Sequence, residues 1–200
     1  MSLPVLIILV GLAYVVLFGG LSLLRREGLS ARFAIEAVVI TLLVSGLTAL
    51  TIIQIHPITF LIVLYLLTMR VRLLVDIGNF FAQRGQFERA KGIYHFTERL
   101  WPDQTGSLVI QVNKATALLQ SGALDDAIAI FTDVLNKSSQ GYLGVKYEAA
   151  THYNLGIAYR SKDMETQARL EFNAVLDTWP ASQYAHRAEL ALSKNRKKSK

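Results

Sequence analysis

This chain of 200 residues, with 52% hydrophobic residues and a net charge of +6, changes composition sharply near Arg70. Residues 1–70 hold six charged side chains, whereas residues 71–193 hold 12 Lys or Arg and 13 Asp or Glu, as in an ordinary soluble domain. The lack of cysteine excludes disulfides, thiolate nucleophiles and cysteine metal sites. We therefore expect a membrane anchor (1–70), a soluble domain (71–195) and a basic tail (196–200).

The first apolar segment, residues 3–24, is predicted to be a transmembrane helix. Its 22 residues, at about 1.5 Å per residue, are enough to cross a hydrocarbon core roughly 30 Å thick. The run is too long for the apolar region of a secretory signal, and no basic residue precedes it. We expect this helix to stay in the membrane.

The second apolar segment, 33–53, is also predicted to span the membrane. Glu36 follows Arg32 by four residues, so one helix face carries both charges near the interface. A proton or ion relay is one interpretation of Glu36. We favour a neutralised interfacial carboxylate, because no second acidic side chain lies within the predicted spans.

The third segment, 57–70, is the shortest of the predicted membrane helices. Pro57 suits the first position of a helix, but only 12 apolar residues follow before Arg70, fewer than the usual 20 or so. It either crosses with Arg70 and Arg72 reaching the headgroups, or docks against the second helix as a re-entrant segment. Because no linker separates it from the soluble part, we expect one continuous helix from about Pro57 to Arg84.

The distribution of basic residues predicts the orientation in the membrane. The loop RREGLSAR, 25–32, has three arginines, whereas the turn QIHP, 54–57, has no Lys or Arg. Basic loops favour the cytoplasmic side. With three crossings, everything after Met69 is then cytoplasmic.

The soluble part contains three ungapped copies of one pattern: IGNFFAQRGQFERAKGIY (77–94), KATALLQSGALDDAIAIF (114–131) and LGIAYRSKDMETQARLEF (155–172). Each copy has a small residue, a large one three positions later, a turn residue, an alanine and an aromatic residue. The small residues are Gly78, Ala115 and Gly156; the aromatic residues are Tyr94, Phe131 and Phe172. This spacing predicts two antiparallel helices joined by a tight turn, with small residues where the helices approach.

The pattern resembles the tetratricopeptide repeat (TPR), of about 34 residues per copy. On that resemblance the repeats are 71–104, 108–141 and 149–182, and the amphipathic segment 183–195 is a cap helix. The predicted fold is all-α: N-terminal transmembrane helices (about 3–24, 33–53 and 57–70) followed by an α-solenoid of three TPR helix pairs and a capping helix. The insert at 138–149 predicts a longer loop or an extended first helix before the third repeat.

The resemblance implies that the first helices line a concave groove that binds a peptide or a partner's helix. The groove residues it implies are Arg72, Val75, Asn79, Gln83, Val112, Asn113, Thr116, Leu119, Gln120, Tyr153, Asn154, Ile157 and Arg160. Asn79 and Asn113 match the asparagines of a clamp that holds a terminal carboxylate in one branch of the family. Val75, Ala150 and Asn154 stand where that clamp has basic residues, so we expect an amphipathic helix or an extended segment instead.

Basic side chains near the predicted interface and in the tail are candidates for contact with anionic lipid: Arg25, Arg26, Arg32, Arg70, Lys194, Arg196, Lys197, Lys198 and Lys200. The tail is either solvated or in contact with lipid headgroups, the nearest anions to a tethered domain. Nucleic acid is not an expected partner, because the folded part has no net positive charge and no recognisable binding motif.

The function expected from the sequence depends on the repeats, the apolar segments and the absence of enzyme motifs. Nucleotide-binding, zinc-protease and hydrolase motifs are missing, and the four histidines are dispersed. We therefore expect no enzyme activity, no metal and no cofactor. The expected function is a membrane-anchored scaffold that recruits or helps assemble a membrane complex, as small repeat proteins of bacterial and plastid membranes do. The alternative is a regulatory or structural subunit of a transport system. We expect a bacterial inner membrane or a plastid membrane.

Overall fold

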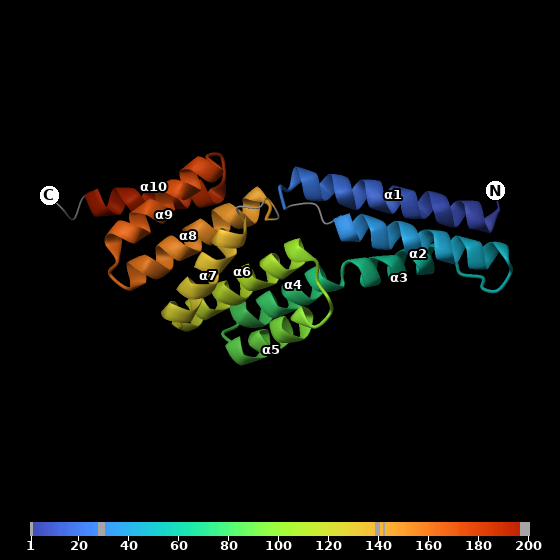
Figure 1. The fold of residues 1–200 in the computed structure, drawn as a ribbon, viewed down its shortest axis with the longest axis horizontal. Helices are drawn as coiled ribbons and strands as arrows, with labels where there is room; N and C mark the ends of the chain where they lie inside the picture. The colour runs from blue at the N-terminus through green and yellow to red at the C-terminus, as the bar shows by residue number, and fades with distance from the viewer. Residues whose placement is uncertain (1, 28–30, 139–140, 142, 197–200) are drawn as a thin grey trace.

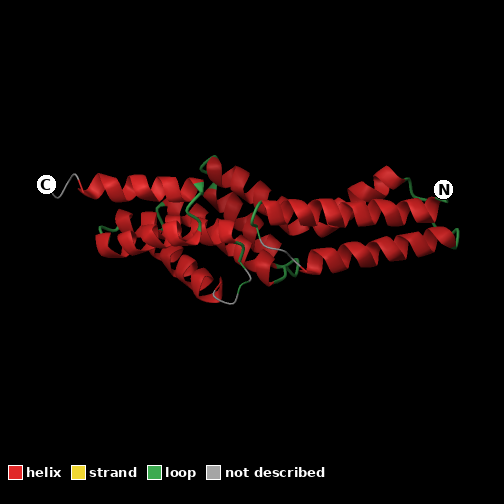
Figure 2. Ribbon diagram, turned by 90° about the horizontal axis from the view of Figure 1, so that it is seen from above, coloured by secondary structure: helices red, strands yellow, loops and turns green. Residues whose placement is uncertain are grey.

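The structure is a computed structural model that describes residues 2–27, 31–138, 141 and 143–196. Within these ranges all regular secondary structure is helical, as the sequence predicted. The helices form two parts placed end to end, an anchor of α1–α3 and a stack of α4–α10 (Figure 1). Seen from above, both parts consist of helices joined by short loops (Figure 2).

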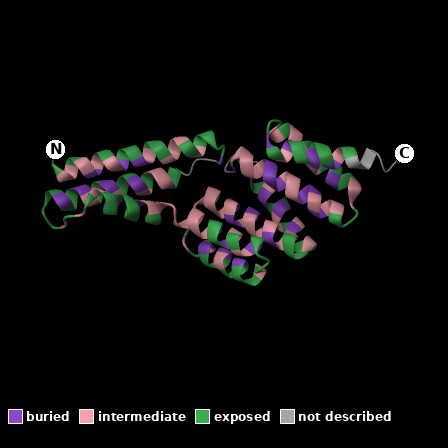
Figure 3. Cartoon of the chain, turned by 180° about the vertical axis from the view of Figure 1, so that it is seen from behind, coloured by how far each residue is buried: buried purple, intermediate pink, exposed green. Residues whose placement is uncertain are grey.

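Helices α1 (Leu3–Leu24) and α2 (Ala31–Ala49) are each long and apolar enough to cross a membrane. They pack against each other and against α3 (Pro57–Thr68). A Cβ on Gly11 would lie 2.2 Å from the Thr41 hydroxyl, so only glycine allows this close contact between α1 and α2. Buried residues lie between the helices and exposed apolar residues lie outside, as expected for faces that contact lipid (Figure 3).

The prediction of one continuous helix from Pro57 to Arg84 is wrong. Helix α3 ends at Thr68 and α4 (Arg70–Gln83) begins at Arg70, with a bend of 69° between them. Two side chains bond to carbonyls in the last turns of α3: Thr68 donates to Leu64 O at 2.8 Å, and Arg70 Nη1 donates to Leu67 O at 2.6 Å. Side chains that take up helix carbonyls favour such a bend. The bent pair is long enough to count as one further span only if taken together.

The stack of α4–α10 consists of three helical hairpins and a final helix. The hairpins are α4 with α5 (Phe87–Glu98), α6 (Gln104–Ser121) with α7 (Leu124–Ser138), and α8 (Val145–Ser161) with α9 (Glu165–Thr178). Helix α10 (Gln183–Arg196) packs on α8 and α9. The first helices contact one another in succession, and each second helix packs on the next first helix. Helix α8 begins four residues before the repeat boundary expected at 149, so the insert extends the first helix.

The repeat pattern determines the packing within each hairpin. A Cβ on Gly78 would lie 2.4 Å from the Tyr94 ring, and one on Gly156 would lie 2.7 Å from the Phe172 ring. Tyr94 is 0% exposed and Phe172 is 1% exposed. The small residue of each first helix therefore gives room to the aromatic residue of the second. The tight turns have the left-handed backbone expected of them, with φ of 72° at Gly85.

Candidate functional site at the junction of anchor and repeats

Glu27, in the segment after α1, connects the anchor to two separate repeats. Its side chain is 5% exposed. Lys146 Nζ donates to Glu27 Oε1 at 2.6 Å, and Arg72 Nη2 lies 2.7 Å from Oε2 as an ion pair without hydrogen-bond alignment. Arg72 is in the first turn of α4 and Lys146 in the first turn of α8. The carboxylate thus lies near two helix N-termini, whose partial positive charge favours an anion.

A backbone contact holds the same segment in place. The Lys146 N–H donates to the Arg26 carbonyl at 3.1 Å. The guanidinium of Arg26 lies 5.6 Å from the ring centroid of Trp179, in the turn between α9 and α10. The segment after α1 is therefore held by the third repeat through a backbone hydrogen bond, an ion pair and a cation–π contact.

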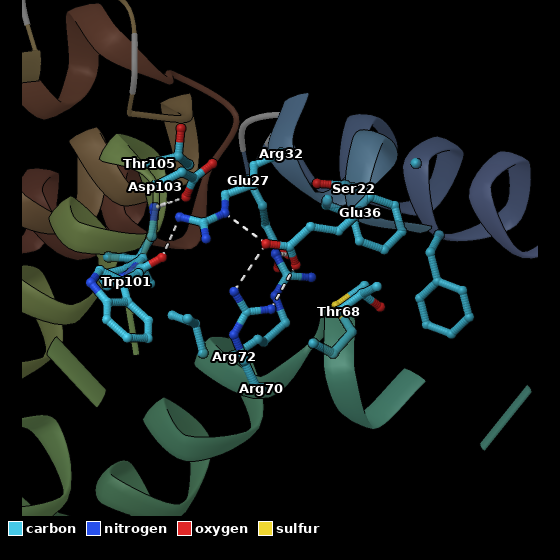
Figure 4. A pocket seen from close by; sticks show the side chains of 18 residues that line it. Ser22, Glu27, Arg32, Glu36, Thr68, Arg70, Arg72, Trp101, Asp103 and Thr105 are labelled. Atoms are coloured by element: carbon cyan, nitrogen blue, oxygen red, sulfur yellow. Dashed lines mark hydrogen bonds and ion pairs between the residues drawn. The ribbon is translucent and has the colours of Figure 1, made fainter. Parts of the chain in front are cut away.

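Glu36 forms a second ion cluster, on the first turns of α2. Arg32 Nε donates to Glu36 Oε1 at 2.6 Å. Arg70 binds the same carboxylate through two nitrogens, at 2.6 and 3.0 Å. Arg32 Nη1 also donates to the Trp101 carbonyl, in the turn that closes the first repeat. Glu36 is thus neutralised by Arg32 and Arg70, and the cluster ties α2 to α4 and to the first repeat (Figure 4).

A small cavity of about 120 Å³ lies between the two clusters. Its lining includes Thr68 of α3 and Thr105 at the start of α6 (Figure 4). Phe18, Phe33 and Gly106 also line it. The volume suits a few water molecules, at about 30 Å³ each. The charged side chains around the cavity form ion pairs with one another, and these ion pairs hold the anchor and the repeats together.

Groups of three or more His, Asp or Glu able to hold a metal are not found in the part of the chain that the structure describes.

The pKa of Tyr147 depends in part on the charge of Glu27. Its pKa is raised to about 12, first because the phenol is buried and second because the negative charge of Glu27 disfavours the phenolate. An unfolded tyrosine titrates near 10. The folded state therefore holds the proton more tightly, and this contribution to stability is complete below pH 10 and is lost as the pH rises through about 12.

Several residues of the expected groove are already engaged. Val75 and Val112 are each 3% exposed and belong to the core, so their side chains cannot reach a partner. Arg72 is paired with Glu27. Tyr153 packs on the rings of Phe172 and Tyr184, each with a centroid distance of 5.9 Å.

The amides of the expected groove also have partners within the chain. Asn79 accepts from the Tyr94 hydroxyl at 2.7 Å. Asn113 donates to Val109 O at 2.7 Å, and Asn154 donates to the Thr116 hydroxyl at 3.1 Å. Leu119, Ile157 and Arg160 are partly exposed, and Gln83 and Gln120 are exposed. Of the expected groove residues, the two glutamines are the most accessible to a partner.

The basic residues expected to face lipid take different places. Arg25 and Arg26 are exposed, and Arg26 lies over Trp179. Arg32 and Arg70 bind Glu36. The expectations for the tail fall on side chains that lie outside the described part: Lys194, Arg196, Lys197, Lys198 and Lys200.

Sequence reasoning missed the role of Glu27 and Lys146. The two residues lie 119 positions apart, so no local pattern connects them. The one available signal was the insert before the third repeat, which contains Lys146 and lengthens α8 toward the anchor.

No protein-family profile, no curated protein and no solved structure matches this chain.

Proposed function

We propose that this protein is a membrane-anchored scaffold whose repeats bind a segment of a partner protein and so help to assemble a membrane complex. The supporting observation is the junction itself. Glu27 is bonded to Lys146 and ion-paired with Arg72, and Arg32 donates to the Trp101 carbonyl. These contacts fix the repeats to the anchor, so the first helices face one direction relative to the membrane.

Tethering gives such a scaffold a physical advantage. A domain confined to the membrane surface meets membrane partners at a raised effective concentration, so a weak binding surface suffices. The binding surface we propose consists of the accessible residues of the expected groove. Gln83 and Gln120 supply exposed amides, and Leu119 and Ile157 supply partly exposed apolar side chains. An amphipathic helix or an extended segment suits such a surface.

The groove can be tested without disturbing the core. Changing Gln83 and Gln120 together to arginine adds bulk and charge at two exposed positions. We expect partners that co-purify with the full chain in mild detergent, identified by mass spectrometry, to be lost from this variant. The matched control changes two exposed residues of α9, Gln167 and Asn173, to arginine and should keep them. If the partners persist in both variants, the groove is not the binding surface, and contact through the membrane helices would favour a transport subunit.

We also propose that the repeats lie on the cytoplasmic side, in a bacterial inner membrane or a plastid membrane. Two arginines, Arg25 and Arg26, lie between α1 and α2, and a third, Arg32, lies in the first turn of α2. The chain has no cysteine, so Ser193→Cys introduces a single exposed thiol on α10. In intact cells an impermeant thiol reagent should label this variant only after lysis. Equal labelling before and after lysis would place the repeats on the outer side.

A further inference from the structure

The first helix of each repeat has a face that receives the second helix of the repeat before it. In α6, Ile110 and Ala117 are 0% and 8% exposed because they pack in one cluster with the first repeat. In α8, Leu155 is 2% exposed and packs in a cluster with Ala127 and Phe131 of α7. The fold thus uses this face twice to bury a helix.

The same face of α4 is open. The ungapped alignment of the copies places Ile77 at the position of Leu155, and Phe80 at the position of Ala117. Ile77 is 46% exposed and Phe80 is 47% exposed. The chain enters α4 directly from α3 through Met69, so no hairpin precedes it in the stack. Ile77 and Phe80 are therefore exposed on the face of α4 that, in the other two repeats, is covered by a packed helix.

Charges flank this face symmetrically. Asp76 and Arg84 lie four residues before and four residues after Phe80, and both are exposed. If a second α4 packs antiparallel with the two Phe80 side chains opposite each other, each Asp76 comes opposite the partner's Arg84. Ile77 comes opposite Gln83 in the same register. The surface is self-complementary, as a twofold interface requires.

A repeat contact in the chain itself supports a charge pair at this position. Arg84 aligns with Lys162 of the third repeat. Lys162 forms an ion pair with Asp125, which lies in the first turn of the preceding second helix, α7. Arg84 instead has its guanidinium 3.9 Å from the centroid of the Phe80 ring. Arg84 thus stands at the position where Lys162, in the third repeat, pairs with an acidic residue of the helix packed against it.

The bend at Met69 makes this interface compatible with a membrane. Figure 1 shows α3 beside α2. If α3 follows the membrane normal, the 69° bend places α4 within about 21° of the membrane plane. Two such helices related by a twofold axis along the normal cross at about 42° from antiparallel, near the magnitude of the commonest packing angle of about 50°. Both copies then keep the same orientation in the membrane.

We propose that the open face of α4 is a homodimer interface, in which α4 of a second copy packs antiparallel about Phe80 and Asp76 of each copy pairs with Arg84 of the other. A two-turn contact of this size is small, but confinement of both copies to the membrane raises their effective concentration. This inference does not require a partner in the groove. Because Gln83 belongs both to this interface and to the proposed groove, Gln120→Arg alone tests the groove without changing the interface.

Charge reversal tests the register in the otherwise native chain. Asp76→Arg or Arg84→Asp alone places like charges opposite each other twice, and each should raise the dimer dissociation constant about tenfold. The double variant rebuilds both pairs with reversed signs and should restore the dimer. The measurement is the protein mass in mild detergent by light scattering, over a range of protein concentrations. Arg169→Glu, an exposed charge reversal on α9, is the control.

A single thiol tests the same register in the membrane. Phe80→Cys should form a disulfide-linked dimer on mild oxidation far more readily than Leu170→Cys, a 65% exposed position on α9. Unchanged melting by circular dichroism would show that the variants fold. A monomer at all concentrations, failure of the double reversal to restore the dimer, or equal cross-linking at both thiol positions would each overturn the proposal. So would a heteromeric partner or lipid found in place of the second copy.

Discussion

Replacing Phe172 with alanine should lower the free energy of unfolding of the repeat part by about 3–5 kcal/mol. The ring is 1% exposed and fills the space beside Gly156, where a Cβ would approach it to 2.7 Å. Removing it leaves a cavity at the centre of the third repeat, where the core cluster also includes Val175 and Ala188 of α9 and α10. Folded domains are stable by only about 5–15 kcal/mol, so this loss is large.

The effect should also be local along the stack. In a solenoid each repeat contacts only its neighbours. Hydrogen exchange of the full chain in mild detergent should therefore show lost protection in α8, α9 and α10 before α4 and α5. The matched control is Phe96→Ala in α5, where the side chain is 54% exposed, and it should change stability by less than about 0.5 kcal/mol. Equal effects of the two substitutions would contradict the packing of the third repeat.

The helical hairpins were predictable because their signal is local and repeated. The residue types that face each other within a hairpin, such as Gly78 and Tyr94, recur at the same spacing in every copy. Helices α1 and α2, which are long and apolar enough to cross a membrane, were predictable from composition, because few charged residues interrupt either apolar run. Both predictions need only the order of residues along short stretches.

The bend and the junction depend on contacts that no short stretch contains. The direction of α4 depends on Thr68 and Arg70 bonding to carbonyls of α3, although the sequence alone favours an uninterrupted helix. Burial of Val75 and Val112 depends on how closely adjacent first helices approach. The pairing of Glu27 with Lys146 joins segments that meet only after the anchor and three repeats have assembled.

Replacing Glu27 with alanine should weaken the attachment of the segment after α1 to α4 and α8, at a cost of about 2 kcal/mol. Breaking a fully buried ion pair costs about 3–5 kcal/mol, but Arg72 and Lys146 are 39% and 38% exposed and regain water. Removing the carboxylate also removes the charge that opposes ionisation of Tyr147. The pKa of Tyr147 should therefore fall below its value of about 12, although burial, the larger cause of the shift, still keeps it above its ordinary value. Titration of tyrosinate absorbance in the full chain, compared with the wild type, measures this change.

Two variants separate this effect from a general loss of an acidic residue. Glu88→Ala removes an exposed carboxylate at the start of α5 and should leave the pKa of Tyr147 unchanged. Lys146→Ala should be destabilising in the wild type but cost little once Glu27 is gone, because the two residues act as one unit. If the two substitutions prove additive, the pair does not hold the segment after α1 to α8. The orientation of the repeats would then depend on the Glu36 cluster and on the bend at Met69.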